Sequence, residues 1–327
     1  MTAPPPPAEG LRLQWGDLPE PVRAAIERRL GSPVAQAVSQ PGGFSPGVAA
    51  RLRTTSGQRI FLKAVGPEPN PSSRASHLRE ARIAAALPPG APVPPFLWAL
   101  RRQGWVALAF QEIDGRQPAQ PWRADELGRV LEAINALSAC LTPSPIPSRL
   151  AGRARRWGPV QRREWRQLRD DRDGVRQDLD PWSRRHLEAL VRLERAAPAA
   201  VDGETLLHLD LRADNLLLTA DRVLVVDWPH ARLGAPWLDA VFFAPSVTMQ
   251  GGPPPEDILA RVPAATVAEP EAITAAVAVV AGFFTRQALL PPPPGLPTLR
   301  AFQRAQGEVA RAWLARRAGL NGRTGWP

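Results

Sequence analysis

The chain has 327 residues, a single cysteine and a net charge of +10. A chain of this length can bury about three quarters of its unfolded surface, which is enough for two lobes with cores of their own. One cysteine excludes an internal disulfide, and this is consistent with a reducing, cytoplasmic location. Cys140 follows an apolar helical pattern, so we predict that it is a small core residue.

The first 15 residues are rich in proline and carry neither a basic start nor an apolar run. We therefore predict that residues 1–15 form a disordered leader and are not a secretion signal. A first helix should begin after the N-cap Asp17 and end at Gly31. The apolar stretch 272–284 is short for a membrane-spanning helix, so we expect no membrane partner.

A glycine-rich segment, PGGFSPGV, occupies residues 41–48. Glycine allows a turn to bring backbone N–H groups close to phosphate oxygens, so we assign Gly42, Gly43 and Ser45 to nucleotide binding. A Gly-Gly turn can join any two strands, so the assignment depends on the neighbouring elements. Two predicted strands come next, over residues 48–54 and 59–65.

The second of these strands contains the only lysine of the chain, Lys63, among 41 basic residues. A chain so rich in arginine is expected to keep a lysine where a compact ammonium is needed and a planar guanidinium does not fit. Phosphate binding is such a role. Glu80, on a helix predicted to be capped by Ser72 or Ser73, is the expected partner of Lys63, although Glu68 and Glu112 are alternatives.

The segment 207–215, LHLDLRADN, places His208, Asp210 and Asn215 in the pattern H-x-D-x-x-x-x-N. An apolar hairpin comes next and ends at Asp227. Such a set can transfer a phosphoryl group: Asp210 would accept a proton from a hydroxyl group, while Asn215 and Asp227 would hold Mg²⁺ through oxygen atoms. Taken singly, His208 could be a core histidine and Asn215 a turn residue, but predicted strands flank the loop.

These features occur in the order found in the aminoglycoside phosphotransferase family, which the chain resembles over residues 40–239. The resemblance implies an α+β, protein-kinase-like fold of two lobes. The small lobe, residues 16–114, would contain an antiparallel sheet and a helix, and the large lobe, residues 115–327, would be mostly helical. ATP or GTP would bind between them, with the backbone at Gln111 and Ile113 contacting the base.

The chain departs from the family pattern at Leu209, where glycine is common. We expect that side chain to point into the core and away from the reacting groups. The resemblance also implies that residues 208–215 form the catalytic loop and that Asp239 braces this loop through hydrogen bonds. The departure at Leu209 removes no reacting group.

These observations favour a kinase that phosphorylates a hydroxyl group of a small molecule, with a nucleotide-binding pseudokinase as the alternative. A protein kinase is disfavoured because Asp239 follows Asp227 by only twelve positions, which leaves no room for an activation loop. The arginine-rich stretch 149–172 contains Trp157 and Trp165. Acidic residues interrupt it, so we predict a solvated helical face and no nucleic-acid partner.

Overall fold

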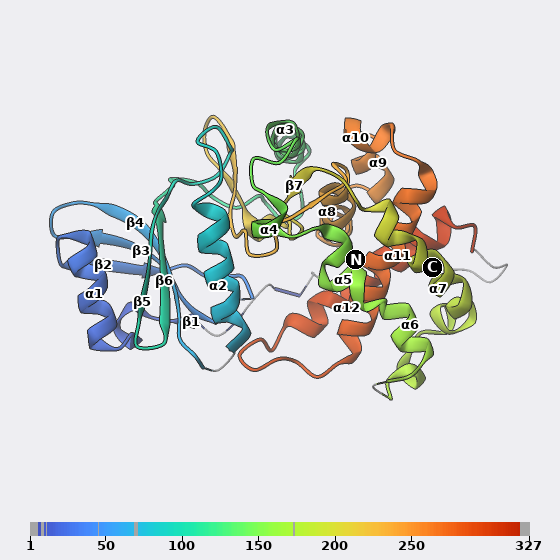
Figure 1. Ribbon diagram of the computed structural model, residues 1–327, viewed down its shortest axis with the longest axis horizontal. Helices are drawn as coiled ribbons and strands as arrows, with labels where there is room; N and C mark the ends of the chain where they lie inside the picture. Colours follow the sequence, from blue (N-terminus) through green and yellow to red (C-terminus); the bar gives the residue numbers. More distant parts are fainter. Residues whose placement is uncertain are drawn as a thin grey trace.

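The computed structural model describes residues 6–7, 10, 12–44, 46–68, 71–172 and 174–320. The chain forms two lobes, one built on a β-sheet and one mostly of helices (Figure 1). Helix α2, Pro71–Ala84, lies between the sheet and the helical lobe. The candidate active site lies where the two lobes meet.

The small lobe is a six-stranded sheet in the order β1-β3-β4-β6-β5, with β2 also pairing with β3. All pairs are antiparallel except β1 with β3. The strands are β1 Arg12–Leu13, β2 Val34–Ser39, β3 Gly47–Thr54, β4 Arg59–Val65, β5 Phe96–Arg102 and β6 Trp105–Gln111. Lys63 lies on the central strand β4, opposite Ala49 and Leu108, so its backbone is fixed from both sides.

The first helix, α1, spans Glu20–Leu30. Gly31 ends it with a left-handed φ of 71°, as predicted. The N-cap prediction is wrong: Pro19 is the N-cap, and Asp17 instead ends a short 3-10 helix, Trp15–Asp17, and accepts a hydrogen bond from Gln14. Proline in the first turn sets the helical φ, so the helix starts without a side-chain cap.

Two residues of the predicted disordered leader belong to the sheet. Residues 12–15 were expected in the disordered leader, but Arg12 and Leu13 form β1, in register with Gly47 and Val48 of β3. A two-residue strand leaves no detectable periodicity, because its stability comes from pairing with a partner far along the chain. This strand places Arg12 beside the glycine-rich segment.

The large lobe contains ten helices longer than three residues and four short strands in the described part of the chain. The helices are α3 Ala124–Cys140, α4 Ser148–Ala151, α5 Gly158–Arg162, α6 Glu164–Arg169, α7 Pro181–Ala200, α8 Leu238–Met249, α9 Pro255–Leu259, α10 Pro263–Thr266, α11 Pro270–Leu289 and α12 Leu299–Arg317. The strands are β7 Thr205–Leu207, β8 Leu216–Leu218, β9 Val223–Val225 and β10 Arg232–Gly234. They form two antiparallel pairs, β7 with β10 and β8 with β9.

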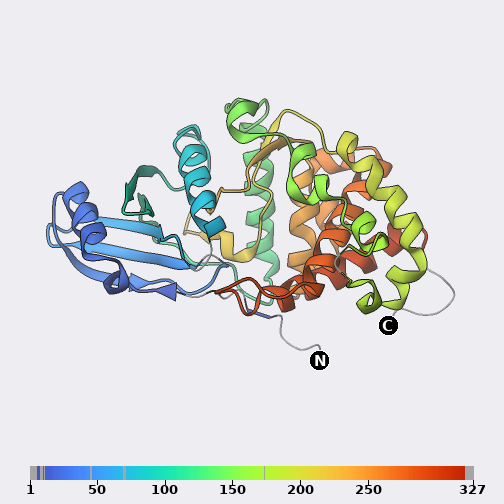
Figure 2. The same ribbon diagram turned by 60° about the horizontal axis from the view of Figure 1, so that its bottom comes forward.

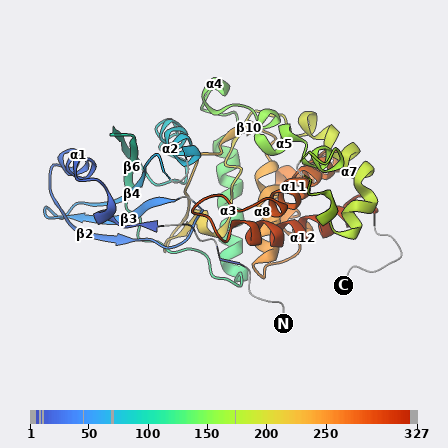
Figure 3. The same cartoon turned by 90° about the horizontal axis from the view of Figure 1, so that it is seen from below.

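Helix α11 is longer than the apolar stretch that predicts it. By length and composition alone it could cross a membrane, but 72% of its apolar window is buried inside the protein. It packs against α7, α8 and α12 in the centre of the large lobe (Figure 3). This is the environment of a core helix.

The predicted core position of Cys140 and the predicted solvated face of residues 149–172 need revision. Cys140 is exposed, because the buried face of α3 continues from Leu137 to Leu141 and leaves Cys140 beside it. Trp157 and Trp165 are buried in the core of the large lobe. Their rings are therefore not exposed for stacking on nucleic-acid bases.

Candidate active site

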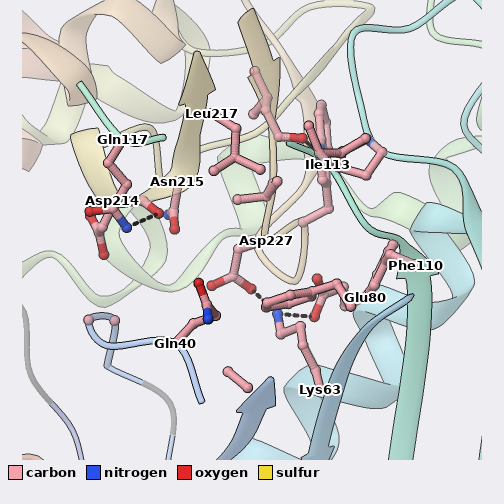
Figure 4. Close-up of a pocket in the computed structure, with 18 of the residues that line it drawn as sticks. Gln40, Lys63, Glu80, Phe110, Ile113, Gln117, Asp214, Asn215, Leu217 and Asp227 are labelled. Carbon is pink, nitrogen blue, oxygen red and sulfur yellow. Dashed lines mark hydrogen bonds and ion pairs between the residues drawn. The ribbon is translucent and has the colours of Figure 1, made fainter. Parts of the chain in front are cut away.

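A cavity of about 440 Å³ lies between the lobes. Its lining includes most of the predicted nucleotide and metal residues, namely Gly42, Gly43, Lys63, Glu80, Gln111, Ile113, Asn215 and Asp227. Figure 4 shows side chains from both lobes pointing toward this space. Ser45 lies outside the described residues. The fold thus brings together segments almost 190 residues apart.

Lys63 is held between two carboxylates at the base of the cavity (Figure 4). Its Nζ atom lies 2.6 Å from Glu80 Oε2 and 2.7 Å from Asp227 Oδ1. Glu112 pairs with Arg59 instead, so Glu80 is the helix partner of Lys63. Burial raises the pKa of Glu80 to about 7, although Lys63 opposes the shift. Burial also opposes ionisation of Asp227, but Lys63 outweighs it and lowers that pKa.

The predicted hinge borders the cavity where β6 ends. Gln111 is the last residue of β6, and its N–H donates to Pro95 O at 2.9 Å. This donor is therefore engaged within the small lobe. Apolar side chains from both lobes, among them Val48, Phe110 and Leu217, line the cavity near this strand. A flat aromatic ring could be enclosed there, with Ile113 at its edge.

Asp210 lies on the loop between β7 and β8, outside the cavity lining but in contact with it through Asn215. Asn215 Nδ2 donates to the Asp210 carbonyl at 2.7 Å and approaches Asp210 Oδ2 at 3.2 Å. The hydrogen bonds fix the amide so that its oxygen is the atom left for another ligand. Burial raises the pKa of Asp210, and the positive charge of Arg212 opposes that shift.

His208 and Asp239 support this loop from behind. The Asp239 carboxylate accepts from His208 N at 2.9 Å and from Leu209 N at 2.7 Å. The His208 ring lies between Val226 O, at 2.9 Å from Nε2, and Asp210 N, which donates to Nδ1 at 3.2 Å. Burial lowers the pKa of His208 to about 4, so the ring is neutral at pH 7. These contacts link β7, the catalytic loop and α8.

Leu209 and Asp227 adopt positive φ angles, of 63° and 71°. This region is strained for residues other than glycine and persists only where surrounding contacts fix it. Asp239 binds the Leu209 N–H, and the Leu209 side chain is buried in the core as expected. Lys63 holds the Asp227 side chain. Both strained residues therefore have an anchor.

Arg212 was not singled out from the sequence, although it lies inside the motif. Its guanidinium donates to Asp210 Oδ1 at 2.6 Å and binds both oxygens of Asp214 at 2.9 Å. Its Cζ atom also lies 5.4 Å from the ring centroid of Phe44 and 5.8 Å from that of Phe302. The catalytic loop, the glycine-rich segment and α12 therefore meet at this side chain.

The glycine-rich segment is positioned by residues from both ends of the chain. Phe44 packs edge-to-face on Phe302 with ring centroids 5.1 Å apart. Arg12 donates to the carbonyl of Gly42. Figure 2 shows the segment that leads into α12 extending from the helical lobe to its junction with the small lobe. None of these long-range contacts has a local sequence signal.

No group of three or more His, Cys, Asp or Glu side chains in the described ranges is arranged to bind a metal. Asn215 and Asp227 alone provide one amide oxygen and one carboxylate. This donor set suits Mg²⁺, which keeps several water or phosphate oxygens as ligands. It does not suit a metal held entirely by protein.

The sequence profile described as the phosphotransferase enzyme family matches residues 41–274. The match covers the glycine-rich segment, Lys63 and the whole catalytic loop. The chain belongs to this phosphotransferase family. The family assignment made from the motifs is confirmed. No relative was found among curated protein sequences.

Solved structures similar to this member of the family share its fold at low sequence identity. An aminoglycoside phosphotransferase in ternary complex with AMP-PNP and hygromycin B is 15% identical, with a TM-score of 0.59 over 93% of this chain and 100% of that one. A choline/ethanolamine kinase family protein from Mesorhizobium loti is 19% identical, with a TM-score of 0.59 over 90% and 94%. The predicted α+β, protein-kinase-like, two-lobed fold is confirmed.

A spectinomycin phosphotransferase in complex with ADP and spectinomycin is a third similar structure. It is 13% identical, with a TM-score of 0.54 over 90% of this chain and 97% of that one. The names of these three proteins refer to different acceptors or acceptor classes. The phosphotransferase fold is therefore shared by proteins named for dissimilar small molecules.

Proposed function

We propose that this phosphotransferase transfers the γ-phosphoryl group of ATP or GTP to a hydroxyl group of a small molecule. The observation that supports this most directly is a set of contacts where the lobes meet. Lys63 binds Asp227, and both line the cavity. Asn215, which also lines the cavity, binds Asp210 beside it. A chain that had lost catalysis would not need this complete set. A nucleotide-binding pseudokinase remains the alternative.

In the proposed reaction Asp210 orients the acceptor hydroxyl and receives its proton. The hydroxyl oxygen attacks the γ-phosphorus and forms the new P–O bond. The bond from the γ-phosphorus to the β,γ-bridging oxygen breaks, and the nucleoside diphosphate leaves. Arg212 and Asn215 each contact one oxygen of the Asp210 carboxylate, so the base is held in one orientation before substrate arrives.

The nucleotide would lie in the 440 Å³ cavity, with its base beside Ile113 and its phosphates beneath the glycine-rich segment. Lys63 would contact phosphate oxygens while Glu80 keeps the ammonium in place. Asn215 and Asp227 would hold Mg²⁺, which neutralises phosphate charge. The assignment of Ser45 to phosphate binding stays a prediction.

The acceptor, we propose, is not strongly polycationic. The net charge of the chain is +10, and a field of this sign opposes the approach of a cation. The guanidinium of Arg212 contacts the Asp210 carboxylate, where the acceptor hydroxyl must bind. Neutral sugars, nucleosides and monocationic amino alcohols remain suitable. Efficient phosphorylation of kanamycin-like compounds would contradict this part of the proposal.

Phosphoryl transfer can be tested with the Asp210→Asn variant. The wild-type protein, Mg-ATP or Mg-GTP and a panel of sugars, nucleosides, amino alcohols and aminoglycosides would first identify an acceptor. Asparagine keeps the shape of Asp210 and removes the base, so turnover should fall roughly 10²–10⁴-fold. Nucleotide affinity should be preserved.

Asp221→Asn is the matched control, because Asp221 is an exposed residue of the turn between β8 and β9. It should turn over the acceptor like the wild-type protein. Near-normal turnover by Asp210→Asn would refute the role of the base. Nucleotide binding without transfer to any acceptor in the panel would favour the pseudokinase.

A further inference from the structure

A cation from the N-terminal strand reaches the nucleotide cleft. Arg12 lies on β1, lines the cavity and donates from Nη2 to the carbonyl of Gly42. A methyl group on Gly43 would lie 2.9 Å from the same nitrogen, so the guanidinium packs directly against the glycine-rich segment. The strand pairing with β3 holds Arg12 in this position.

Arg12 lies at the phosphate end of the cleft. Burial lowers the pKa of Arg12, and among the described carboxylates Asp227 and Asp214 oppose that shift. Asp227 is the proposed metal ligand, and Asp214 adjoins Asn215. The Arg12 guanidinium therefore faces the region where the metal and the terminal phosphates would bind. It approaches from the side of the glycine-rich segment, whereas Lys63 approaches from β4.

The other described arginines that line the cavity make their contacts at the opposite end, near the hinge. Arg51 contacts Glu112 and the carbonyl of Gly115, beside the hinge. Arg116 pairs with Glu126 on α3.

At the phosphate end, Lys63 is shared between two carboxylates. His77, which also lines the cavity, is neutral at pH 7 because burial lowers its pKa to about 4. Among the described lining residues, Arg12 is therefore the second cation that the phosphates would meet.

We propose that Arg12 is a nucleotide-binding residue whose guanidinium donates hydrogen bonds to the terminal phosphate oxygens of the bound nucleoside triphosphate. The inference rests on the nucleotide site of the proposed function. A planar guanidinium can bind Gly42 O through one nitrogen and phosphate oxygens through others, since it carries five N–H donors. The same side chain would hold the glycine-rich segment over the phosphates it binds.

The test compares dissociation constants of Mg-ATP, Mg-ADP and adenosine, with Mg-GTP, Mg-GDP and guanosine in parallel. The proteins are the wild type, Arg12→Gln, Arg12→Lys and the control Arg29→Gln, whose exposed side chain lies on α1. Losing charge-assisted hydrogen bonds should weaken triphosphate binding by Arg12→Gln roughly 10–100-fold. Diphosphate binding should weaken less, and nucleoside binding should not change.

Arg12→Lys keeps the positive charge but loses the planar guanidinium with its several N–H donors. Its triphosphate affinity should therefore lie between those of Arg12→Gln and the wild type. Equal losses for the triphosphate, diphosphate and nucleoside would show that Arg12 only supports the fold, and would overturn the inference. So would wild-type affinity of Arg12→Gln for triphosphates. If the wild-type protein itself bound no nucleotide, the proposed function would fail, and the inference with it.

Discussion

The catalytic loop and the glycine-rich segment are held in place by different kinds of contact. The catalytic loop is fixed within the large lobe, by hydrogen bonds from Asp239 and through the His208 ring. The glycine-rich segment is fixed by Arg12 near one end of the chain and by Phe302 near the other. The proposed reacting groups therefore depend on contacts within the large lobe, and the proposed phosphate-binding segment depends on the assembly of both lobes.

This difference predicts that damage to the two regions has different consequences. Loss of a contact behind the catalytic loop should reduce stability and turnover together, because those hydrogen bonds are buried. Loss of a contact that holds the glycine-rich segment should change nucleotide affinity and leave most of the stability intact. Three experiments test this comparison.

The largest effect is expected from Asp239→Ala. The substitution leaves the His208 and Leu209 N–H groups buried without their acceptor. Each such group costs about 1–3 kcal/mol, so the free energy of unfolding should fall by roughly 2–6 kcal/mol. Turnover should fall as well, since the strained Leu209 backbone would no longer be fixed beside Asp210. Denaturant unfolding and steady-state kinetics measure the two changes.

Asp221→Ala, in the exposed β8–β9 turn, is the control for this experiment. Its free energy of unfolding should lie within about 1 kcal/mol of the wild-type value. An Asp239→Ala protein as stable as that control would show that the loop is held by other contacts.

The second-largest effect is expected on the free energy of unfolding at low pH. The pKa of His208 is about 4 in the folded protein against 6.5 for an ordinary histidine. The unfolded chain therefore binds the proton more readily below pH 6.5. The stability that the neutral ring contributes is complete above that pH and is lost as the pH falls toward 4. The expected loss from this one group is roughly 3 kcal/mol at pH 4.

His208→Gln removes this titration. Its free energy of unfolding, measured from pH 8 to pH 4, should depend less on pH than that of the wild type over the window 6.5 to 4. If the free energies of unfolding of the wild type and of His208→Gln changed equally with pH, His208 would not be buried in its neutral form.

The smallest effect is expected at the glycine-rich segment. Phe44→Leu removes an edge-to-face contact with Phe302 and a cation–π contact with Arg212. Such contacts contribute about 1 kcal/mol each, so the affinity for Mg-ATP should fall roughly 5–30-fold. Thermal stability should change little.

A double-mutant cycle with Phe302→Leu isolates the contact between the two rings. If that contact positions the segment, the losses of nucleotide affinity in the two single variants should not add in the double variant. Fully additive losses would mean that Phe44 acts independently of α12.

Most of the active-site set could be predicted from the sequence because its residues stand in short, ordered motifs. His208, Asp210 and Asn215 lie within eight positions, and the next buried hairpin delivers Asp227. The single lysine among 41 basic residues indicated Lys63 and, through it, a carboxylate on the next helix. The order of these motifs resembles that of a known family, and this resemblance predicted the two-lobed fold.

Other features depended on contacts that no local pattern encodes. The strand β1 exists because Arg12 and Leu13 pair with β3, about 35 positions away. The exposure of Cys140 results from the way α3 faces its neighbours, and the start of α1 from a proline in place of a cap. Short strands and helix boundaries of this kind have too few residues to leave a periodic signal.

The sequence by itself determined the family, the fold and the residues that could carry the chemistry, since each depends on residue types at fixed local spacing. Only the tertiary structure decided which side chains reach the cleft from elsewhere. Arg12 and Phe302 come within reach of the glycine-rich segment because folding brings β1 and the first turn of α12 to the junction of the lobes. Contacts between distant segments are set by the packing of whole elements, so they carry no motif.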